Sequence, residues 1–355
     1  MQALDAQLLA LASNYQRQRH LPPGQYASCT IKPIPLLAEL LCHCEWYLRE
    51  IDQLHTGIEC LTTAKEICED YYGDEADPLT GLIYSNMGVI YVAKLLPQES
   101  LAICEKALEI RRRCLPPQHP RIGESLNNRA GAYFDLGRLE DAQRTWEESR
   151  DIQEAAEIPN CNLLEGVYSN IGMNLMGMKK YKEADKSLQT AMSFHDNYTG
   201  GSFYPALTRF RLGRLRIRQE RWEEAEQELQ TAHDAWILTL GAKHRWVANT
   251  KDQLARVRHH RGHDHGEDGA IQLLRDAIKV FDKLESDPGH VIRSEFLLAR
   301  ILSDIGTRTM NESFLKESEA LEAHARDRHS QKPTLAALPC ETEEQRGLFV
   351  SEEWR

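Results

Sequence analysis

Small residues recur along the chain at a nearly constant interval, each within a stretch of helically spaced large apolar residues. The interval is 42, 42, 41 and 42 positions between the small residues Gly88, Ala130, Gly172, Gly213 and Ala255. Around the first of them, Tyr84, Met87 and Tyr91 stand at i, i+3 and i+7, which gives the apolar stripe of an amphipathic helix. A fixed period of this size indicates a repeat architecture.

Each of the middle three small residues is followed by a short polar turn and a second helical pattern. The turns read DLGR from Asp135, GMKK from Gly177 and RQER from Arg218. Small residues then return at the spacing of a helix, at Ala142 and Ser149, Ala184 and Ala191, and Ala225 and Ala232. Longer connectors with glycine, proline and capping residues, such as QHPRIG and GAKHRW, separate one pair from the next. The pattern predicts helical hairpins.

The best-matched stretches are GAYFDLGRLEDAQRTWEES, GMNLMGMKKYKEADKSLQTA and GRLRIRQERWEEAEQELQTA. They resemble tetratricopeptide repeats, and the 42-residue spacing is similar to the long-repeat subtype seen in kinesin light chains. The same subtype occurs in the repeat tails of fungal receptor-like ATPases, whose end the closing FVSEEWR also resembles. This resemblance implies an all-α fold, a right-handed α-α superhelix (TPR solenoid) of six to seven helical hairpins.

The domain organisation follows from where the repeat pattern can be recognised. We expect an N-terminal helix and connector over residues 1–35, the solenoid over 36–326, and a tail with a short closing helix over 327–355. Units from Ala255 and Leu298 carry insertions in their turns, and a further unit is expected near Gly57, Leu61 and Ala64.

Composition narrows the classes of partner and compartment. Hydrophobic residues make up 41% of the chain and charged residues 27%, as in folded domains, and the net charge of −11 argues against nucleic acid as the partner. No apolar run is long enough for a membrane span. The nine cysteines form no CxxC pair, which favours reduced thiols in the cytoplasm, with the nucleus as the alternative.

Two residues before each small residue stands a hydrogen-bond donor: Asn86, Asn128, Asn170, Arg211 and Gln253. In the families that the chain resembles this position lies on the concave inner face. A repeated amide suits the backbone of an extended peptide, because it both donates and accepts hydrogen bonds. The other interpretation, that these side chains bond neighbouring helices and fix the packing of repeats, stays open.

The later inner positions are basic. Arg211, Arg214 and Arg218 are spaced by three and four residues on one helix, and Arg256 follows in the next unit. We therefore expect a concave groove that binds an acidic segment of a protein or peptide. Pairing of these arginines with glutamates of adjacent helices is the alternative.

The predicted function is non-catalytic: a scaffold or adaptor without a metal ion or cofactor. The sequence contains no nucleotide-binding, hydrolase or zinc-protease motif, and HHRGHDHGED from His259 is best interpreted as a solvated loop. Two alternatives remain. The first is an enzyme or small-molecule binder, with His195, Tyr204 and His244 in connectors as its candidate groups. The second is a regulatory arm that self-associates, as a homo-oligomer, or docks an ATPase partner.

Overall fold

The structure is a computed structural model, and it describes residues 2–20, 32, 34–50, 53–73, 77–94, 96–157, 159–194, 203–284 and 288–331. These residues form fifteen α-helices, and the described residues contain no strand. The all-α prediction is therefore confirmed.

The chain divides into two compact units, residues 1–157 and 158–355. The first unit contains α1 (Gln2–Arg19), α2 (Pro35–Glu50), α3 (Leu54–Tyr72), α4 (Pro78–Ala93), α5 (Pro97–Cys114), α6 (Pro120–Asp135) and α7 (Leu139–Glu154). The second contains α8 (Cys161–Gly177), α9 (Tyr181–Ser193), α10 (Phe203–Arg218), α11 (Trp222–Leu240), α12 (Arg245–His260), α13 (Ala270–Phe281), α14 (Pro288–Thr309) and α15 (Glu312–Ser330).

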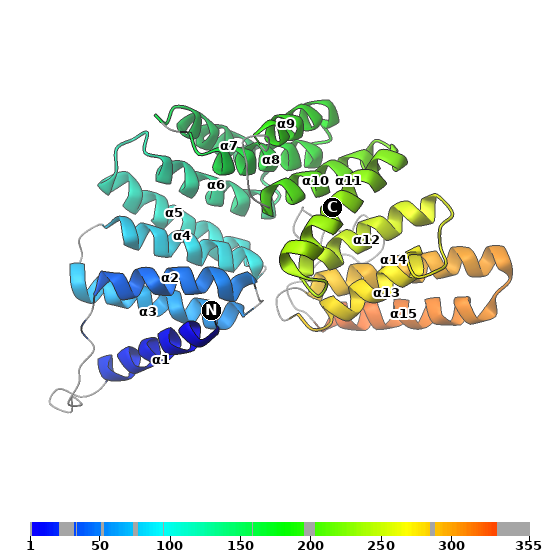
Figure 1. Ribbon diagram of the computed structural model, residues 1–355, viewed down its shortest axis with the longest axis horizontal. Coiled ribbons are helices and arrows are strands. Elements are labelled where there is room, and N and C mark those ends of the chain that lie inside the picture. Colours follow the sequence, from blue (N-terminus) through cyan, green and yellow to red (C-terminus); the bar gives the residue numbers. More distant parts are fainter. Residues whose placement is uncertain are drawn as a thin grey trace. The chain divides into compact units, whose positions relative to one another are not determined.

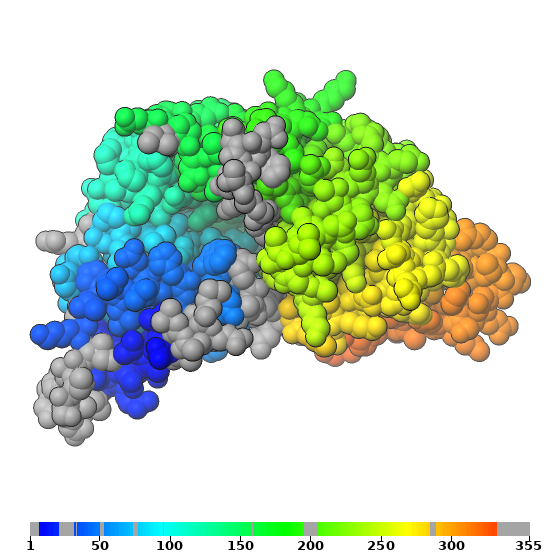
Figure 2. All heavy atoms as spheres, viewed as in Figure 1, coloured from blue at the N-terminus to red at the C-terminus, as the bar shows by residue number. Residues whose placement is uncertain are grey.

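From α2 onward, consecutive helices pair into hairpins, which follow one another in chain order within each unit (Figure 1). The pairs run from α2 with α3 to α14 with α15, which gives seven hairpins in the described residues. In each unit the first helix of a hairpin also contacts the first helix of the next, and side chains fill the space between the ribbons (Figure 2). The prediction of six to seven hairpins is confirmed.

The polar turns close the hairpins through a left-handed residue at a repeated position. Gly137, Lys179 and Glu220 have φ angles of 71°, 60° and 57°. Proline and capping residues start several of the first helices: Asp77 accepts a hydrogen bond from the amide of Leu79 at 2.7 Å, directly before Pro78. Local sequence therefore fixes both the start of the first helix and the turn that leads to the second.

The recurring small residues lie where the two helices of a hairpin cross. A β-carbon added to Gly172 would stand 2.6 Å from Cγ of Leu188, and one added to Gly213 would stand 2.6 Å from Cγ of Leu229. At Ala130, whose side chain is fully buried, the crossing leaves room for one methyl group. Close approach of the helices thus explains the small-residue period.

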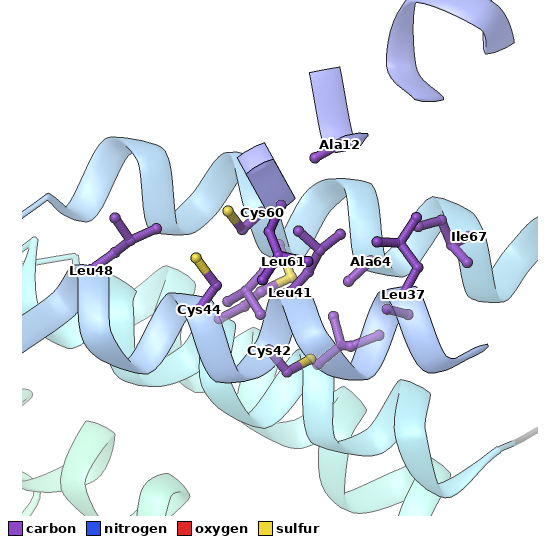
Figure 3. Packing of buried hydrophobic residues seen from close by; sticks show 14 of the residues in the cluster. Ala12, Leu37, Leu41, Cys42, Cys44, Leu48, Cys60, Leu61, Ala64 and Ile67 are labelled. Carbon is purple, nitrogen blue, oxygen red and sulfur yellow. The ribbon is translucent and has the colours of Figure 1, made fainter. Parts of the chain in front are cut away.

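The core of the first unit combines aliphatic side chains with buried thiols. Cys42 and Cys44 of α2 and Cys60 of α3 lie among leucines such as Leu41 and Leu61 (Figure 3). Burial raises the pKa of the Cys60 thiol to about 12, so this thiol stays protonated and packs as an apolar group.

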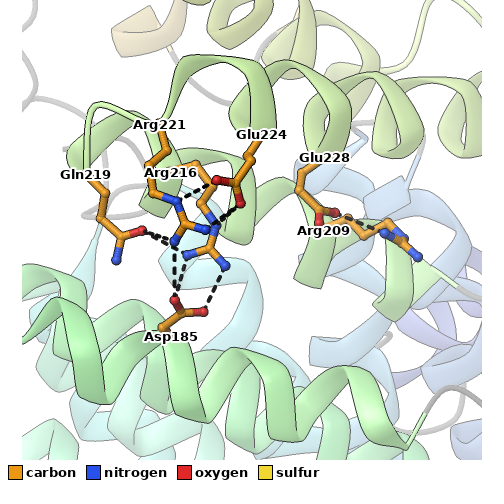
Figure 4. Close-up of polar contacts among 7 residues, drawn as sticks. All are labelled: Asp185, Arg209, Arg216, Gln219, Arg221, Glu224 and Glu228. Carbon is orange, nitrogen blue, oxygen red and sulfur yellow. Dashed lines mark hydrogen bonds and ion pairs between the residues drawn. The ribbon is translucent and has the colours of Figure 1, made fainter.

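An ion-pair network joins three helices of the second unit (Figure 4). Both terminal nitrogens of Arg216 in α10 bond the carboxylate of Asp185 in α9, at 2.7 and 3.0 Å. Arg221, directly before α11, pairs with Glu224 in the first turn of α11, and Glu224 lies 3.6 Å from Arg216 Nε. The network connects one hairpin to the next through charge-assisted hydrogen bonds.

The last described helix, α15, ends at Ser330. The tail with a closing helix was predicted over residues 327–355, of which residues 332–355 lie outside the described residues, so this part of the expected organisation stays a prediction. Within the part of the chain that the structure describes, we find no helix with the length and apolarity that a membrane crossing requires.

Candidate functional site

The predicted inner positions all lie on first helices of hairpins. We call the five side chains two residues before the small residues the ladder residues: Asn86 in α4, Asn128 in α6, Asn170 in α8, Arg211 in α10 and Gln253 in α12. The three asparagines are half-buried, whereas Arg211 and Gln253 are buried.

In the first unit, one ladder residue joins two hairpins. Asn128 Nδ2 donates to the hydroxyl of Ser85 in α4 at 3.1 Å. The neighbouring Asn127 accepts a hydrogen bond from Trp146 Nε1 of α7 at 3.0 Å. Asn128 thus bonds a preceding helix, as the packing interpretation predicted for this residue.

In the second unit, Arg211 makes the equivalent bond. Its Nη1 donates to the hydroxyl of Ser169 in α8 at 2.8 Å. Ser85 and Ser169 each stand three residues before the small residue of their unit, so an amide and a guanidinium use the same position. The hydroxyl of Thr208 in α10 also reaches Ser169, at 3.1 Å, and Glu165 at 3.3 Å.

The three arginines of α10 that were predicted to line the groove differ in their surroundings. Arg211 and Arg214 are only 3% and 6% exposed, and the guanidinium of Arg214 lies 6.0 Å from the ring centroid of Phe210. Arg218, at the end of the helix, is exposed. All three arginines lie on one helix at the predicted spacing, but only the one at the end of the helix is exposed to solvent.

Asp252 of α12 is contacted by three polar side chains, which the sequence pattern did not predict. This fully buried carboxylate accepts hydrogen bonds from Gln253 Nε2 at 3.0 Å and from the hydroxyl of Ser294 in α14 at 2.5 Å. Arg293 Nη2 of α14 lies 3.4 Å away. Asp252 stands three residues before Ala255, the register of Ser85 and Ser169, and this recurrence was the available signal.

Two charged groups near these helices have shifted pKa values. Burial raises the pKa of Glu165 to about 7, although the hydrogen bond from Thr208 acts in the opposite direction. Burial lowers the pKa of the half-buried Arg256, and the nearby carboxylate of Asp252 partly offsets this.

The candidate enzymatic groups do not form a described site. His195 and the side chain of Tyr204 lie outside the described residues. His244 caps α12, where its Nδ1 accepts a hydrogen bond from the amide of Trp246 at 3.2 Å. The described residues also contain no cluster of three or more histidine, cysteine or carboxylate side chains suited to a metal ion.

A cavity of about 750 Å³ opens in the first unit, away from the ladder residues. It is lined by Arg112, Pro117, Gln118, Ile122, Arg144, Glu147, Glu148, Asp151 and Ile152. Arg112 and Glu148 pair across it at 2.9 Å. Its lining of charged pairs differs from an apolar pocket with a few convergent polar groups.

Most of the histidine-rich stretch is exposed, as expected of a solvated loop, but one of its residues is buried. Asp264 is 3% exposed, and it bonds His259 Nδ1 at 2.7 Å and Arg308 at 3.2 Å. His260 stacks on Trp222, with ring centroids 3.8 Å apart. The insertion is therefore anchored through Asp264 to α12 and α14, which a pattern of polar residues alone does not reveal.

Comparison with known families agrees with this architecture. A model of the tetratricopeptide repeat matches residues 79–155 and 204–283. These two stretches of the chain are tetratricopeptide repeats. The matches cover α4 to α7 and α10 to α13, so tetratricopeptide repeats are found in both units.

Among curated proteins, the repeats are similar to those of nephrocystin-3 from Xenopus laevis. The two sequences are 26% identical over 112 residues, which are 32% of this chain and 8% of nephrocystin-3. The chain thus matches a small part of that protein's length.

Several solved structures share the fold of these tetratricopeptide repeats. The apo quorum sensor NprR from B. thuringiensis has a TM-score of 0.60 at 16% identity, covering 92% of this chain and 82% of that chain. A Rap conjugation gene regulator of plasmid pLS20, in complex with the Phr* peptide, has a TM-score of 0.51 at 16% identity, covering 84% and 98%. A signal transduction ATPase from Pyrococcus horikoshii, with a tetratricopeptide repeat sensor, has a TM-score of 0.55 at 13% identity, covering 81% of this chain and 42% of that chain. At these identities the likeness concerns the fold alone.

Proposed function

We propose that the chain is a non-catalytic scaffold or adaptor that binds an extended acidic segment of a protein or peptide along its first helices. The proposed contact residues are Asn86, Asn128, Asn170, Arg211, Arg214, Arg218, Gln253 and Arg256. We further propose that it acts in the cytoplasm.

The observation that carries this proposal is the register of donors between α10 and α12. Arg211 and Gln253 occupy one position of the repeat, and Arg214 and Arg256 occupy another, with 42 residues between the members of each pair. Since α10 contacts α12, the repeat brings donors of the same kind to neighbouring helices. A row of donors at regular intervals suits an extended chain with repeated acceptors.

The positive charge of the arginines in this row of donors favours an acidic ligand. Guanidinium groups bind carboxylates through paired hydrogen bonds. The chain as a whole carries a net charge of −11, so a local group of arginines stands out against an acidic background and would steer a negatively charged partner.

The contacts in the second unit suggest a division of roles among the proposed residues. Arg211 is bonded to Ser169 and joins two hairpins. Arg218 is exposed and Arg256 is half-buried, so these two arginines are best placed to meet a ligand. The peptide complex of the Rap regulator supports the proposal to the extent that a protein of this fold holds a peptide.

The test compares charge removal at the proposed site with charge removal elsewhere. The probes are short peptides in which glutamate alternates with apolar residues, and matched peptides with glutamine in place of glutamate. We expect the double variant Arg218→Gln/Arg256→Gln to bind the glutamate peptides about tenfold more weakly than the unchanged chain. The control variant, Arg113→Gln/Arg144→Gln, removes two exposed arginines of the first unit and should leave binding unchanged.

Binding should also weaken as salt is added, because exposed charge pairs are screened. Circular dichroism of each variant checks that the helices persist. Equal binding of the glutamate and glutamine peptides, or equal loss in both double variants, would exclude recognition by these arginines.

A further inference from the structure

The described part of the chain ends beside the proposed binding helices. In the last turn of α15, Arg328 Nε lies 3.3 Å from Glu295 Oε1 of α14. Two residues earlier in α14, Arg293 lies 3.4 Å from Asp252 of α12. An α-helix with its side chains is about 10 Å across. The chain therefore leaves α15 about one helix diameter from Asp252.

The sequence that follows has the chemistry of the proposed ligand. Residues 332–355, which lie outside the described residues, contain five glutamates against three basic residues. The glutamates form two groups, ETEE from Glu341 and SEE from Ser351, and the apolar LFV stands between them. This is an acidic segment interrupted by apolar residues, of the kind that the arginines of α10 and α12 would attract.

The length of the segment is sufficient for its glutamates to reach these arginines. An extended chain covers about 3.3 Å per residue, so the ten residues from Lys332 to Glu341 span up to about 30 Å. Packed helices lie about 8 to 10 Å apart, so α10 lies up to about 30 Å from α15, across α14 and α12. No rearrangement of the described helices is needed for this reach.

We propose that residues 341–353 bind in cis to Arg218 of α10 and Arg256 of α12 and compete there with an external acidic partner. The inference rests on the proposed function, because it names an occupant of the same binding site. A tethered segment acts at an effective concentration on the order of millimolar. An external partner must therefore outcompete it, so release of the segment would control access.

The test uses the full chain and a labelled synthetic peptide with the sequence of residues 338–355. In the unchanged chain, the tethered copy competes with the added peptide. The variant Glu343→Gln/Glu344→Gln weakens the tethered copy, so we expect it to bind the added peptide about tenfold more tightly than the unchanged chain. The control Glu105→Gln/Glu109→Gln removes two exposed carboxylates from α5 and should bind as the unchanged chain does.

The tighter peptide binding expected of the Glu343→Gln/Glu344→Gln variant must depend on Arg218 and Arg256. Adding Arg218→Gln/Arg256→Gln to the Glu343→Gln/Glu344→Gln variant should abolish it, and a peptide with glutamine at the glutamate positions should bind neither chain. An unchanged affinity in the Glu343→Gln/Glu344→Gln variant, or a gain that survives loss of the arginines, overturns the proposal. If other glutamate peptides still bind through the arginines, the proposed function stands and only the cis segment is rejected.

Trypsin cleavage after Arg346 provides a second measurement that does not need an added ligand. A docked segment is protected, so cleavage should be several-fold faster in the Glu343→Gln/Glu344→Gln variant, relative to the rates of both chains in denaturant. If the cleavage rate relative to the rate in denaturant is the same in both chains, docking of the segment is contradicted.

Discussion

Ser85 and Ser169 each accept a hydrogen bond from the next repeat, and they do so at the same register. The donor is an amide in one case, Asn128 at 3.1 Å, and a guanidinium in the other, Arg211 at 2.8 Å. Each bond holds two first helices together and keeps a polar group satisfied within a packed interface. The ladder position therefore serves packing in these two repeats, while its role in binding stays a proposal.

Glu165 predicts a dependence of stability on pH. Its pKa is raised by burial from the ordinary 4.5 to about 7, so the folded state retains a proton that the unfolded state loses. Stability from this group is full below pH 4.5, falls as pH rises, and levels off above about 7. Replacing it by Glu165→Gln should remove this loss. The measurement is the free energy of unfolding of both chains at several pH values.

A matched substitution at an exposed carboxylate, Glu183→Gln, controls for the change in net charge. Its stability should follow that of the unchanged chain through the same pH window. Parallel curves for Glu165→Gln and the unchanged chain would show that Glu165 ionises at its ordinary pKa.

At the scale of the helix pair, α8 and α9 cross so closely at Gly172 that no larger side chain fits there. A β-carbon there would stand 2.6 Å from Cγ of Leu188 and 3.3 Å from the backbone oxygen of Ala184. We expect Gly172→Ala to lower the free energy of unfolding by about 1 to 3 kcal/mol, because the two helices must move apart.

Gly131 provides the matched control for this substitution. It is also inside a helix, α6, but nothing lies within 4 Å of an added β-carbon. Gly131→Ala should be neutral or stabilise by up to about 1 kcal/mol through helix propensity. Equal effects of the two substitutions in denaturant unfolding would contradict a steric role for Gly172.

The hairpins could be predicted from sequence because local signals define them. Gly88, Gly172 and Gly213 mark close crossings, and the turns before α7, α9 and α11 repeat their position. The orientation of Arg211 could not be predicted in the same way. Its partner Ser169 is 42 residues away, and only packing of α8 on α10 brings them together.

The same limit explains what was missed at Asp252 and Asp264. Each looks like one more polar residue of an acidic chain, yet both are buried and hold side chains from α14. Burial of a carboxylate depends on neighbours distant in sequence, so it does not follow from the repeat pattern.

At the scale of the molecule, each hairpin contacts mainly its neighbours, so stability is expected to be local. The bond between Asp185 and Arg216 joins α9 to α10, and Arg216 keeps only 8% of its side chain exposed. Asp185→Asn should therefore reduce amide protection from hydrogen exchange in α9 to α11 and leave α2 to α5 unchanged.

The exposed pair between Arg144 and Asp141 provides the comparison, since Arg144 is 76% exposed. Loss of that pair in Arg144→Gln should change protection little anywhere, because exposed ion pairs contribute at most about 1 kcal/mol. A uniform loss of protection across both units after Asp185→Asn would instead indicate that the chain unfolds as a single cooperative body.

The serine that accepts either an amide or a guanidinium has a consequence for how such a chain diversifies. A copied repeat can exchange asparagine for arginine at the position of Asn128 and Arg211 while the hydroxyl of Ser85 or Ser169 continues to receive a proton donor. Mutation can thus change the charge at this position without disturbing the hydrogen bond between repeats. The hydroxyl that joins two repeats therefore accepts a neutral or a charged donor, so natural selection can vary the charge at this position while the bond between repeats is kept.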